Sequence, residues 1–557
     1  MKTELRFVVA ILLVVGVLVA TNFLFPPAPK APMATASDSA RASAPAVRRA
    51  PGDPVPAVRA IADSVGPADS AGVRTDETER GVMVESPLYR HVFSTRGARL
   101  VSAEMLKHRS FTRPGPAQLI PEGESAFGAR FQVGRDTIDL RDAPFTPSSE
   151  RVQVVDGSEQ LTFRHEEPGL VVEITYRFRA DDYLIDVVGS VQGLERPLLI
   201  ADLGAGLALN DQDKTAETRS LQYVVNHLRE GISPENIAKV ETPSLQEGPF
   251  LWVAFKSKFF TVALLPEAQG VGPEHFGGLL VRPTAPGRVE LAITEEVPAD
   301  GRWGYRAYVG TLEYARMEAI GDDFDDVNQY RPRFLVPIVR PLVGVITRIL
   351  SFLHDTLNVG YGWVLVLFGV LMRVVLWPLN QKAMRAQMKN MAVQPLLKEI
   401  QTKYKDKPEK QQQEMLRLYK EHGFNPMAGC LPMLLPWPVL IALFFVFGNT
   451  IEFRGESFFW LPDLSAPDPY YLLPIILGAS MFLLQWIAMK AMAEVNPQAQ
   501  MMMWTMPAVM IFVFFKLAAG LNLYYAVSNL ATIPQQLWIS RERQKVQAQP
   551  PPKLKTT

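Results

Sequence analysis

The sequence predicts a multi-domain chain: an α-helical polytopic membrane protein with six transmembrane helices that also carries a mainly-β sandwich domain. Three observations predict this. The chain has 557 residues, too many for one domain at roughly 100–200 residues each. Apolar runs of bilayer length gather at the N-terminus and after residue 358. Between them, short stretches alternate apolar and polar residues, as half-buried strands do.

Composition excludes several classes of function. Fifty-seven basic residues balance 57 acidic ones, so the chain lacks the basic excess of a general nucleic-acid coat, and no specific nucleic acid is expected. The single cysteine, Cys430, excludes an intramolecular disulfide and any multi-cysteine zinc or iron–sulfur site. No HExxH, GxSxG or P-loop motif occurs, so we expect no enzyme, metal or cofactor.

Residues 1–25 are interpreted as an uncleaved transmembrane anchor. The apolar run Phe7–Phe25 has 19 residues, close to the ~20 that a membrane span needs. A cleaved signal peptide is the alternative, but no clean small-residue cleavage site follows the run. Residues 26–80 are rich in Pro, Ala and Ser, and this composition predicts a flexible linker.

Residues 81–330 predict the sandwich domain. Apolar and polar residues alternate over 172–178 and again over Arg288–Thr294, and many such short strands suggest a large antiparallel sandwich. One longer helix is expected near Asp213–Val225. We find no catalytic motif here, although a groove for a sugar or a peptide stays open as an interpretation.

Residues 334–354 predict an amphipathic helix that lies in the outer membrane interface. The segment is apolar but contains Arg340, Arg348, Pro337 and Pro341. As a seventh span it would place the basic C-terminal tail outside, against the distribution of loop charges.

Residues 358–540 predict a transmembrane core, and loop charges orient it. The loop 380–426 carries ten basic residues against five acidic ones, and the tail 541–557 carries five against one. The loop 450–469 has one arginine and four acidic residues. Both termini are therefore expected in the cytoplasm. The five predicted spans are Val359–Leu379, Met427–Gly448, Tyr470–Met489, Gln500–Leu517 and Leu521–Ile539.

Residues 380–423 predict a cytoplasmic helical hairpin with helices at Asn380–Thr402 and Glu409–His422. It is either a solvated hairpin packed on itself or a docking surface for a ribosome, lipid headgroups or an emerging chain. Its candidate residues are three methionines on one helix face and two lysines at the turn: Met384, Met388, Met391, Lys403 and Lys405.

Arg373 lies inside the first core span among apolar residues. An arginine at the centre of a span costs about 2.5–3.5 kcal/mol by insertion scales. Two interpretations are open. The side chain snorkels to the cytoplasmic end of the span, or it faces a water-filled pocket in the inner half of the membrane. No acidic residue accompanies it in the core spans, so the parts of an acid-based proton relay are missing.

Polar residues on other spans are candidates to line the same pocket. Asn, Ser and Thr side chains also mediate helix packing, and tyrosines also form interfacial belts, so both roles are open for each residue. Several polar residues on one helix favour a wet interior. The candidates are Gln485, Asn522, Tyr524, Tyr525, Ser528, Asn529 and Thr532.

An ordered set of motifs resembles the YidC/Oxa/Alb family of membrane protein insertases. The set is Asn358–Trp363 (NVGYGW), Arg373, Trp377–Leu379 (WPL), Gln394-Pro395, Leu418–Lys420 (LYK), Asn425–Pro432 (NPMAGCLP), Leu464–Pro474 (LSAPDPYYLLP) and Gly520–Gln536 (GLNLYYAVSNLATIPQQ). Trp252–Pro266 and Tyr308–Gly310 resemble the periplasmic domain of the Gram-negative form.

The resemblance implies a five-helix insertase core around a hydrophilic groove that opens to the cytoplasm and the lipid and is closed outside. It implies that Arg373 is the groove arginine and that Tyr524 and Tyr525 contact the substrate. It also implies an inner-membrane location with the large domain in the periplasm. The implied function is insertion and folding of membrane proteins, without a cofactor. The implied partners are nascent membrane proteins, the Sec translocon, its SecDF accessory complex, ribosomes and the phospholipid bilayer.

Two positions depart from the family pattern. Gly369 stands where many relatives have Thr, and Pro436 where many have Gln, so each change removes a polar group. Two other functions are alternatives. A secondary transporter of a small anion should show inverted repeats, and none is visible. A membrane-tethered periplasmic chaperone or sugar-binding module would use the spans only as an anchor.

Overall fold

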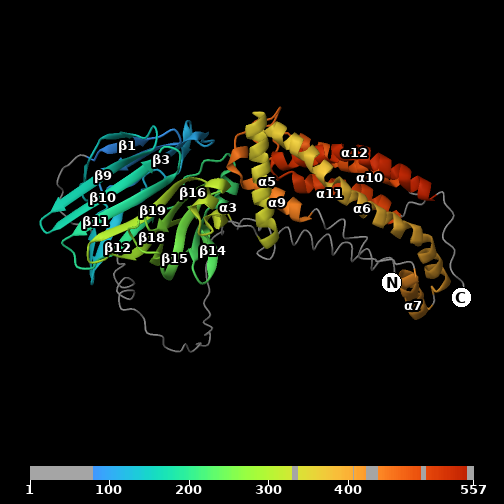
Figure 1. Ribbon diagram of the computed structural model, residues 1–557, viewed down its shortest axis with the longest axis horizontal. Helices are drawn as coiled ribbons and strands as arrows, with labels where there is room; N and C mark the ends of the chain where they lie inside the picture. Colours follow the sequence, from blue (N-terminus) through green and yellow to red (C-terminus); the bar gives the residue numbers. More distant parts are fainter. Residues whose placement is uncertain are drawn as a thin grey trace, which may run out of the picture. The chain divides into compact units, whose positions relative to one another are not determined.

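The computed structural model describes residues 79–285, 287–328, 336–405, 407–421, 437–490 and 497–547. The chain divides into two compact units, one ending at Gln329 and the other beginning at Tyr330 (Figure 1). The predicted anchor over residues 1–25 lies outside the described residues, as does the predicted linker apart from its last two positions. Cys430, Pro436 and the last ten residues of the tail also lie outside them.

The first unit is mainly β, as predicted. Its strands are β1 Gly81–Glu85, β2 Tyr89–Ser94, β3 Leu100–Arg109, β4 Pro116–Gln118, β5 Ala129–Val133, β6 Asp136–Asp139, β7 Thr146–Pro147, β8 Arg151–Gln153, β9 Ser158–Glu167, β10 Leu170–Arg179, β11 Leu184–Gln192, β12 Leu198–Gly204, β13 Gln222–His227, β14 Gly231–Asn236, β15 Ser244–Lys256, β16 Phe260–Pro266, β17 Phe276–Ala285, β18 Arg288–Glu296 and β19 Arg302–Thr311.

These strands form two sheets. A five-stranded sheet has the order β4-β3-β2-β1-β8. The larger sheet runs β6-β5-β12-β18-β17-β15-β16-β19-β11-β10-β9-β7, with β13 and β14 attached through β15. The ring of Phe93 on β2 lies 4.6–6.2 Å from those of Phe163, Tyr176 and Phe178 on β9 and β10, so the sheets face each other across an aromatic core. One pair departs from the antiparallel expectation, because β1 and β8 are parallel.

The helix expected near Asp213–Val225 is shorter than predicted. Helix α3 spans Lys214–Ser220, and the side chain of Asp213 caps its start by accepting from the amide of Ala216. The remainder, from Gln222, is strand β13, since its β-branched and aromatic residues pair with β15. The other short elements are η1 Ile237–Lys239, α4 Tyr314–Ile320 and η2 Phe324–Val327.

The second unit is helical. Its elements are α5 Val336–Leu357, α6 Tyr361–Lys403, α7 Pro408–Glu421, α9 Trp437–Asn449, η5 Ile451–Phe453, α10 Leu472–Lys490, α11 Pro497–Phe514 and α12 Ala519–Gln547. The first core span and the first hairpin helix, predicted as separate segments, are one continuous helix of 43 residues, α6. The change from apolar to basic residues near residue 380 marks a change of surroundings and not an interruption of the backbone.

Helices α6, α10 and α12 run side by side, whereas α5 is steeply inclined to them and packs against α6 and α9 (Figure 1). Helix α5 buries one stripe, Val339, Val343, Ile346 and Leu350, in the core of this unit. The spacing of this stripe, at every third or fourth residue, is that of an amphipathic helix. The exposed side of α5 also carries large apolar residues, among them Ile338, Val345 and Phe352, so the predicted placement of this helix in the interface stays a prediction.

Three helical segments in the described residues are long and apolar enough to cross a membrane: Val336–Leu357, Tyr361–Pro378 and Leu472–Lys490. Shorter apolar segments are Pro438–Asn449 and Met503–Phe514. The number of six spans therefore stays a prediction. One of the three long segments is α5, which is predicted to lie in the interface.

Candidate functional site

Arg373 lies on α6 at its contact with α12. Its Nε donates hydrogen bonds to the hydroxyl oxygen of Ser528 at 2.9 Å and to the carbonyl oxygen of Ser528 at 3.0 Å. The two helices approach closely here because Gly369 has no side chain. A Cβ at that position would lie 3.2 Å from Cγ1 of Val527, tighter than ordinary van der Waals contact. A side chain at position 369 would therefore press on Val527 of α12.

The guanidinium of Arg373 keeps hydrogen-bonding capacity beyond these two contacts. It is partly buried. Among the described residues it forms no salt bridge, and only Nε has a hydrogen-bond acceptor. Because a guanidinium carries five N–H donors, its terminal nitrogens can bind water or a polar chain.

Ser528 and Thr532 complete a small polar cluster with Arg373. Ser528 is 3% exposed. The Thr532 hydroxyl donates to the Ser528 carbonyl oxygen at 2.6 Å, so that oxygen accepts from both side chains. Of the predicted groove residues, Arg373, Ser528 and Thr532 are joined by these hydrogen bonds, and the side chain of Tyr524, one helical turn before Ser528, also forms a hydrogen bond with Ser528.

Two asparagines of α12 instead bind neighbouring helices. Asn529 Nδ2 donates to the hydroxyl of Ser480 on α10 at 3.0 Å, and Asn522 Nδ2 donates to the carbonyl of Phe514 on α11 at 3.1 Å. These contacts favour the packing interpretation for both residues. Sequence reasoning missed Ser480, since a lone serine in an apolar helix carries no signal. Gln485 is partly buried on α10.

Tyr524 and Tyr525 lie in an aromatic cluster. The ring of Tyr524 is 5.6 Å from Phe368 and 6.0 Å from Phe447, and the Tyr525 ring is 5.6 Å from Phe514. The two tyrosine rings are 5.3 Å apart. Tyr524 is only 5% exposed and belongs to the apolar core, so at least this ring packs within the helix bundle.

The end of α6 and helix α7 form the predicted hairpin. Leu396, Ile400 and Leu418 make its small apolar core. Lys403 and Lys405 are exposed at the turn. Met384, Met388 and Met391 lie on α6, but their side chains fall outside the described residues.

The loop between α9 and α10 is bound to the start of α12. The amide of Ala519 donates to the Ala466 carbonyl at 2.7 Å, and that of Gly520 donates to the Leu464 carbonyl at 2.8 Å. Leu464 is fully buried. Backbone donors at the first turn of a helix have no partner within the helix, and here the loop supplies two. These hydrogen bonds fix the loop against the start of α12.

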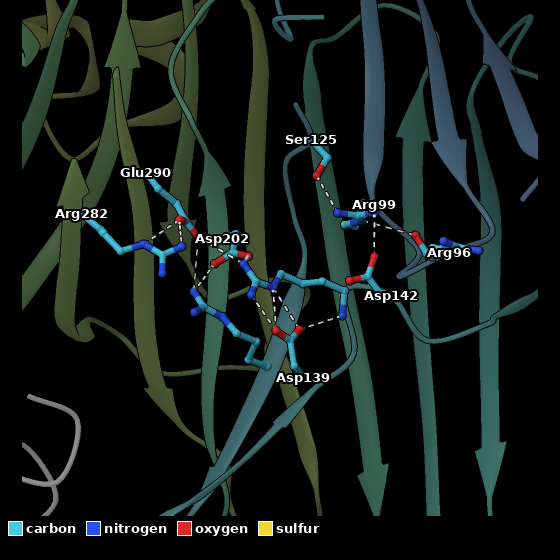
Figure 2. Close-up of polar contacts among 10 residues, drawn as sticks. Arg96, Arg99, Ser125, Asp139, Asp142, Asp202, Arg282 and Glu290 are labelled. Atoms are coloured by element: carbon cyan, nitrogen blue, oxygen red, sulfur yellow. Dashed lines mark hydrogen bonds and ion pairs between the residues drawn. The ribbon is translucent and has the colours of Figure 1, made fainter. Parts of the chain in front are cut away.

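The β unit contains an ion-pair network across neighbouring strands (Figure 2). Arg130 pairs with Asp202 at 2.5 Å, and Arg141 pairs with Asp139 at 2.6 Å and with Glu290 at 3.4 Å. Burial raises the pKa of Asp202 to about 6, although Arg130 and Arg141 oppose this. The charges pair with one another, so we interpret the network as structural. In the residues that the structure describes, no group of three or more His, Cys, Asp or Glu could hold a metal ion.

Two family models match the chain. One, described as 60Kd inner membrane protein, matches residues 352–547, and the other, described as YidC periplasmic domain, matches residues 81–345. A curated protein from Chlorobium luteolum named membrane protein insertase YidC is 31% identical over 525 residues, covering 87% of this chain and 86% of that protein. Its namesake from Chlorobaculum tepidum is 29% identical over 546 residues, covering 90% and 89%. A crystal structure described as an active YidC insertase with the first transmembrane domain resolved covers 83% of this chain and 93% of that one, at 18% identity and a TM-score of 0.33.

Proposed function

The chain belongs to the YidC family of membrane protein insertases, and on that premise we propose how it moves a polar segment of a substrate into the bilayer. It is an inner-membrane protein with a periplasmic domain, and an insertase is not an enzyme. We place Arg373 at the centre of a water-filled groove that opens to the cytoplasm and is closed outside. The groove lowers the barrier for a short hydrophilic tail, and no covalent step is needed.

The observation that carries this proposal is the hydrogen bonding of Arg373. A central arginine costs about 2.5–3.5 kcal/mol in a span. Hydrogen bonds that involve a charged group contribute about 1.5–3 kcal/mol, so Ser528 offsets much of that cost. The terminal nitrogens then remain to hold water and the acidic or polar groups of a passing tail.

We propose that the loop between α9 and α10 closes the outer end of the groove. The loop that binds Ala519 and Gly520 satisfies the backbone at the start of α12, which leaves the cytoplasmic side for entry. Tyr525, which is partly buried beside Tyr524, is the better placed of the two tyrosines to contact substrate. Gln485, Asn522, Asn529 and Thr532 are proposed to line or support the groove.

The apolar helix of the substrate is proposed to leave along α11. This helix exposes Met501 by 48%, Trp504 by 63% and Phe512 by 71%. Methionine adapts to varied apolar partners. Burial of the substrate helix in lipid supplies about 25 cal/mol per Å². The membrane potential contributes about 2.3 kcal/mol per charge per 100 mV on acidic residues.

The topology is proposed as six spans with both termini in the cytoplasm: the anchor at 1–25, α6 and α9 to α12. Helix α5 is proposed to lie in the outer interface, because in Figure 1 it is steeply inclined to α6, α10 and α12. Lys403 and Lys405 at the exposed hairpin turn are proposed to meet ribosomes or lipid headgroups. The Sec translocon and SecDF are proposed partners on the strength of the family alone.

The test is insertion of a one-span protein with a short acidic N-terminal tail into proteoliposomes, measured by protease protection. We expect Arg373→Ala to lower insertion by about tenfold to 150-fold, since it removes a charge-assisted contact worth about 1.5–3 kcal/mol. Arg373→Lys keeps the charge and should retain part of the activity. Lys516 is an exposed cation at the proposed outer end of α11, away from the groove. Lys516→Ala therefore serves as the matched control and should leave insertion unchanged. Full activity of Arg373→Ala would return Arg373 to the snorkelling interpretation.

A further inference from the structure

A tight turn between α9 and α10 holds an aromatic residue in an unfavourable backbone conformation. The amides and carbonyls of Phe458 and Leu461 exchange two hydrogen bonds of 2.9 Å, which closes a two-residue turn. Its first central residue, Phe459, has φ of 50°, a region where glycine is favoured. The Phe459 side chain is nonetheless 74% exposed. A large apolar ring thus stands at the tip of a turn where neither the backbone nor a buried core requires it.

The tip rests on a fixed platform at the start of α6. The Phe458 ring lies over Gly362, where a Cβ would come within 2.1 Å of Cδ2 of that ring. The ring of Trp363 lies 5.5 Å from Phe458 and 6.0 Å from Phe459. Trp460 follows, 6.4 Å from Phe459. We call Trp363, Phe458, Phe459 and Trp460 the aromatic tip.

The aromatic tip continues an exposed apolar stripe on α6. Trp363 is 52% exposed, Leu367 43%, Val370 44% and Val374 64%. Residues spaced by three or four positions share one face of a helix. On a helix that spans the membrane this face meets lipid, and the tip lies at its outer end. Aromatic side chains at the end of a lipid-facing surface are typical of the membrane–water interface.

We infer that the aromatic tip is an anchor in the outer leaflet, at the boundary between headgroups and acyl chains, and that it fixes the depth of Arg373. Arg373 follows Trp363 by ten residues. At 1.5 Å per residue the separation is about 15 Å along α6, half of a hydrocarbon core about 30 Å thick. An anchored tip therefore holds Arg373 at the middle of the bilayer. This inference rests on α6 spanning the membrane, as proposed above, and not on insertion activity.

The first test measures whether the tip enters lipid. In a Cys430→Ser background, Phe459→Cys is labelled with a fluorophore in vesicles of phosphatidylethanolamine and phosphatidylglycerol. The vesicles carry a nitroxide on the headgroup, near the top of the acyl chain, or near its end. We expect the shallow acyl-chain nitroxide to quench most. Val155→Cys, also 74% exposed but in the β unit, should not be quenched by either acyl-chain nitroxide. Phe512→Cys on α11, 71% exposed, is the positive control for contact with lipid.

The proposed anchor is wrong if neither acyl-chain nitroxide quenches the label at position 459 while the label at position 512 is quenched. If that label is also shielded from an aqueous quencher, a protein surface covers the tip and the lipid assignment is wrong. Since insertion is not measured, failure here leaves the proposed insertase function standing.

The second test measures the depth of Arg373 through its neighbour. A label at Val374→Cys should be quenched most by the deep nitroxide. Adding Phe459→Asp should shift that maximum toward the shallow nitroxide, whereas Phe459→Trp should leave it unchanged. Phe459→Gly removes the ring, and glycine favours the positive φ of this position, so the turn is retained. The depth of strongest quenching should shift in the same direction as in Phe459→Asp. An unchanged depth in both Phe459→Asp and Phe459→Gly would show that the tip does not set the position of Arg373.

Discussion

Arg373 and Glu295 show two ways in which this chain accommodates a charged residue away from water. Arginine keeps its charge in proteins, so Arg373 depends on acceptors, and Ser528 supplies two. Glutamate can instead take up a proton. Glu295 on β18 is 1% exposed, and burial raises the pKa of its carboxyl to about 8. At neutral pH the carboxyl of Glu295 is therefore mostly protonated and neutral, whereas the guanidinium of Arg373 is charged and held by hydrogen bonds.

The raised pKa of Glu295 predicts a pH-dependent stability. The folded state holds the proton more tightly than the unfolded state, whose pKa is near 4.5. The stabilising effect is complete below that value and is lost as pH rises toward about 8, at no more than about 1.4 kcal/mol per pH unit. Glu295→Gln removes this slope. The free energy of unfolding of Glu295→Gln, relative to that of the parent chain, should therefore rise between about pH 5 and pH 8. Hydrogen exchange of the β18 amides, corrected for intrinsic exchange rates, measures this difference.

The neighbouring Glu296, which is exposed, provides the control for this measurement. Glu296→Gln should track the parent chain across the same pH range. Parallel curves for Glu295→Gln and the parent chain would mean that Glu295 is ionised inside the fold, and the account of its burial would be wrong.

At the scale of elements, Asp468 holds the start of α10. The residue is 1% exposed, and its carboxylate accepts from the amides of Leu473 at 2.7 Å and Tyr470 at 3.0 Å. Such a cap contributes about 0.5–2 kcal/mol. Asp468→Ala should therefore speed hydrogen exchange of the Leu473 amide by about threefold to thirtyfold.

Asp463→Ala is the matched control for Asp468. Within the described part of the chain, the Asp463 carboxylate accepts from the amide and hydroxyl of Ser465 in the same loop, so its loss should spare Leu473. Equal effects of the two changes would show that the loop as a whole, and not the cap, holds this end of α10.

Some elements could be predicted from the sequence because their signal is local. The alternation over 172–178 gives β10, and its buried residues are the ones that the pattern selects. The apolar part of α6 ends at Pro378, close to the predicted end of the span, but the helix itself continues to Lys403, because charge reports the surroundings of a helix and not the continuity of its backbone. The end of α3 failed for a related reason, since β13 is set by pairing with β15, a strand that begins 22 residues after β13 does.

At the scale of the whole molecule, the sequence could identify the family and the polar residues but not their partners. Arg373 and Ser528 are 155 residues apart, and nothing local predicts their hydrogen bonds. Tyr524 is polar enough to suggest a groove, yet three aromatic neighbours place it in the core. Gly369, a lost polar group in the sequence, is a close helix contact in the structure. The roles of these residues depend on contacts between helices, and those contacts form only when the helices assemble into a bundle.

The central claim is that the groove around Arg373 holds water that reaches the cytoplasm. The most direct measurement compares two single cysteines in a Cys430→Ser background, using a membrane-impermeant thiol reagent added to inside-out membrane vesicles. Thr532 is partly buried beside Ser528, whereas Val374 is 64% exposed on the proposed lipid face. A thiol must ionise in water to react. We predict that Thr532→Cys reacts and Val374→Cys does not, although Val374 is the more exposed side chain. If Thr532→Cys is as inert as Val374→Cys, no water reaches Arg373 and the groove mechanism is contradicted.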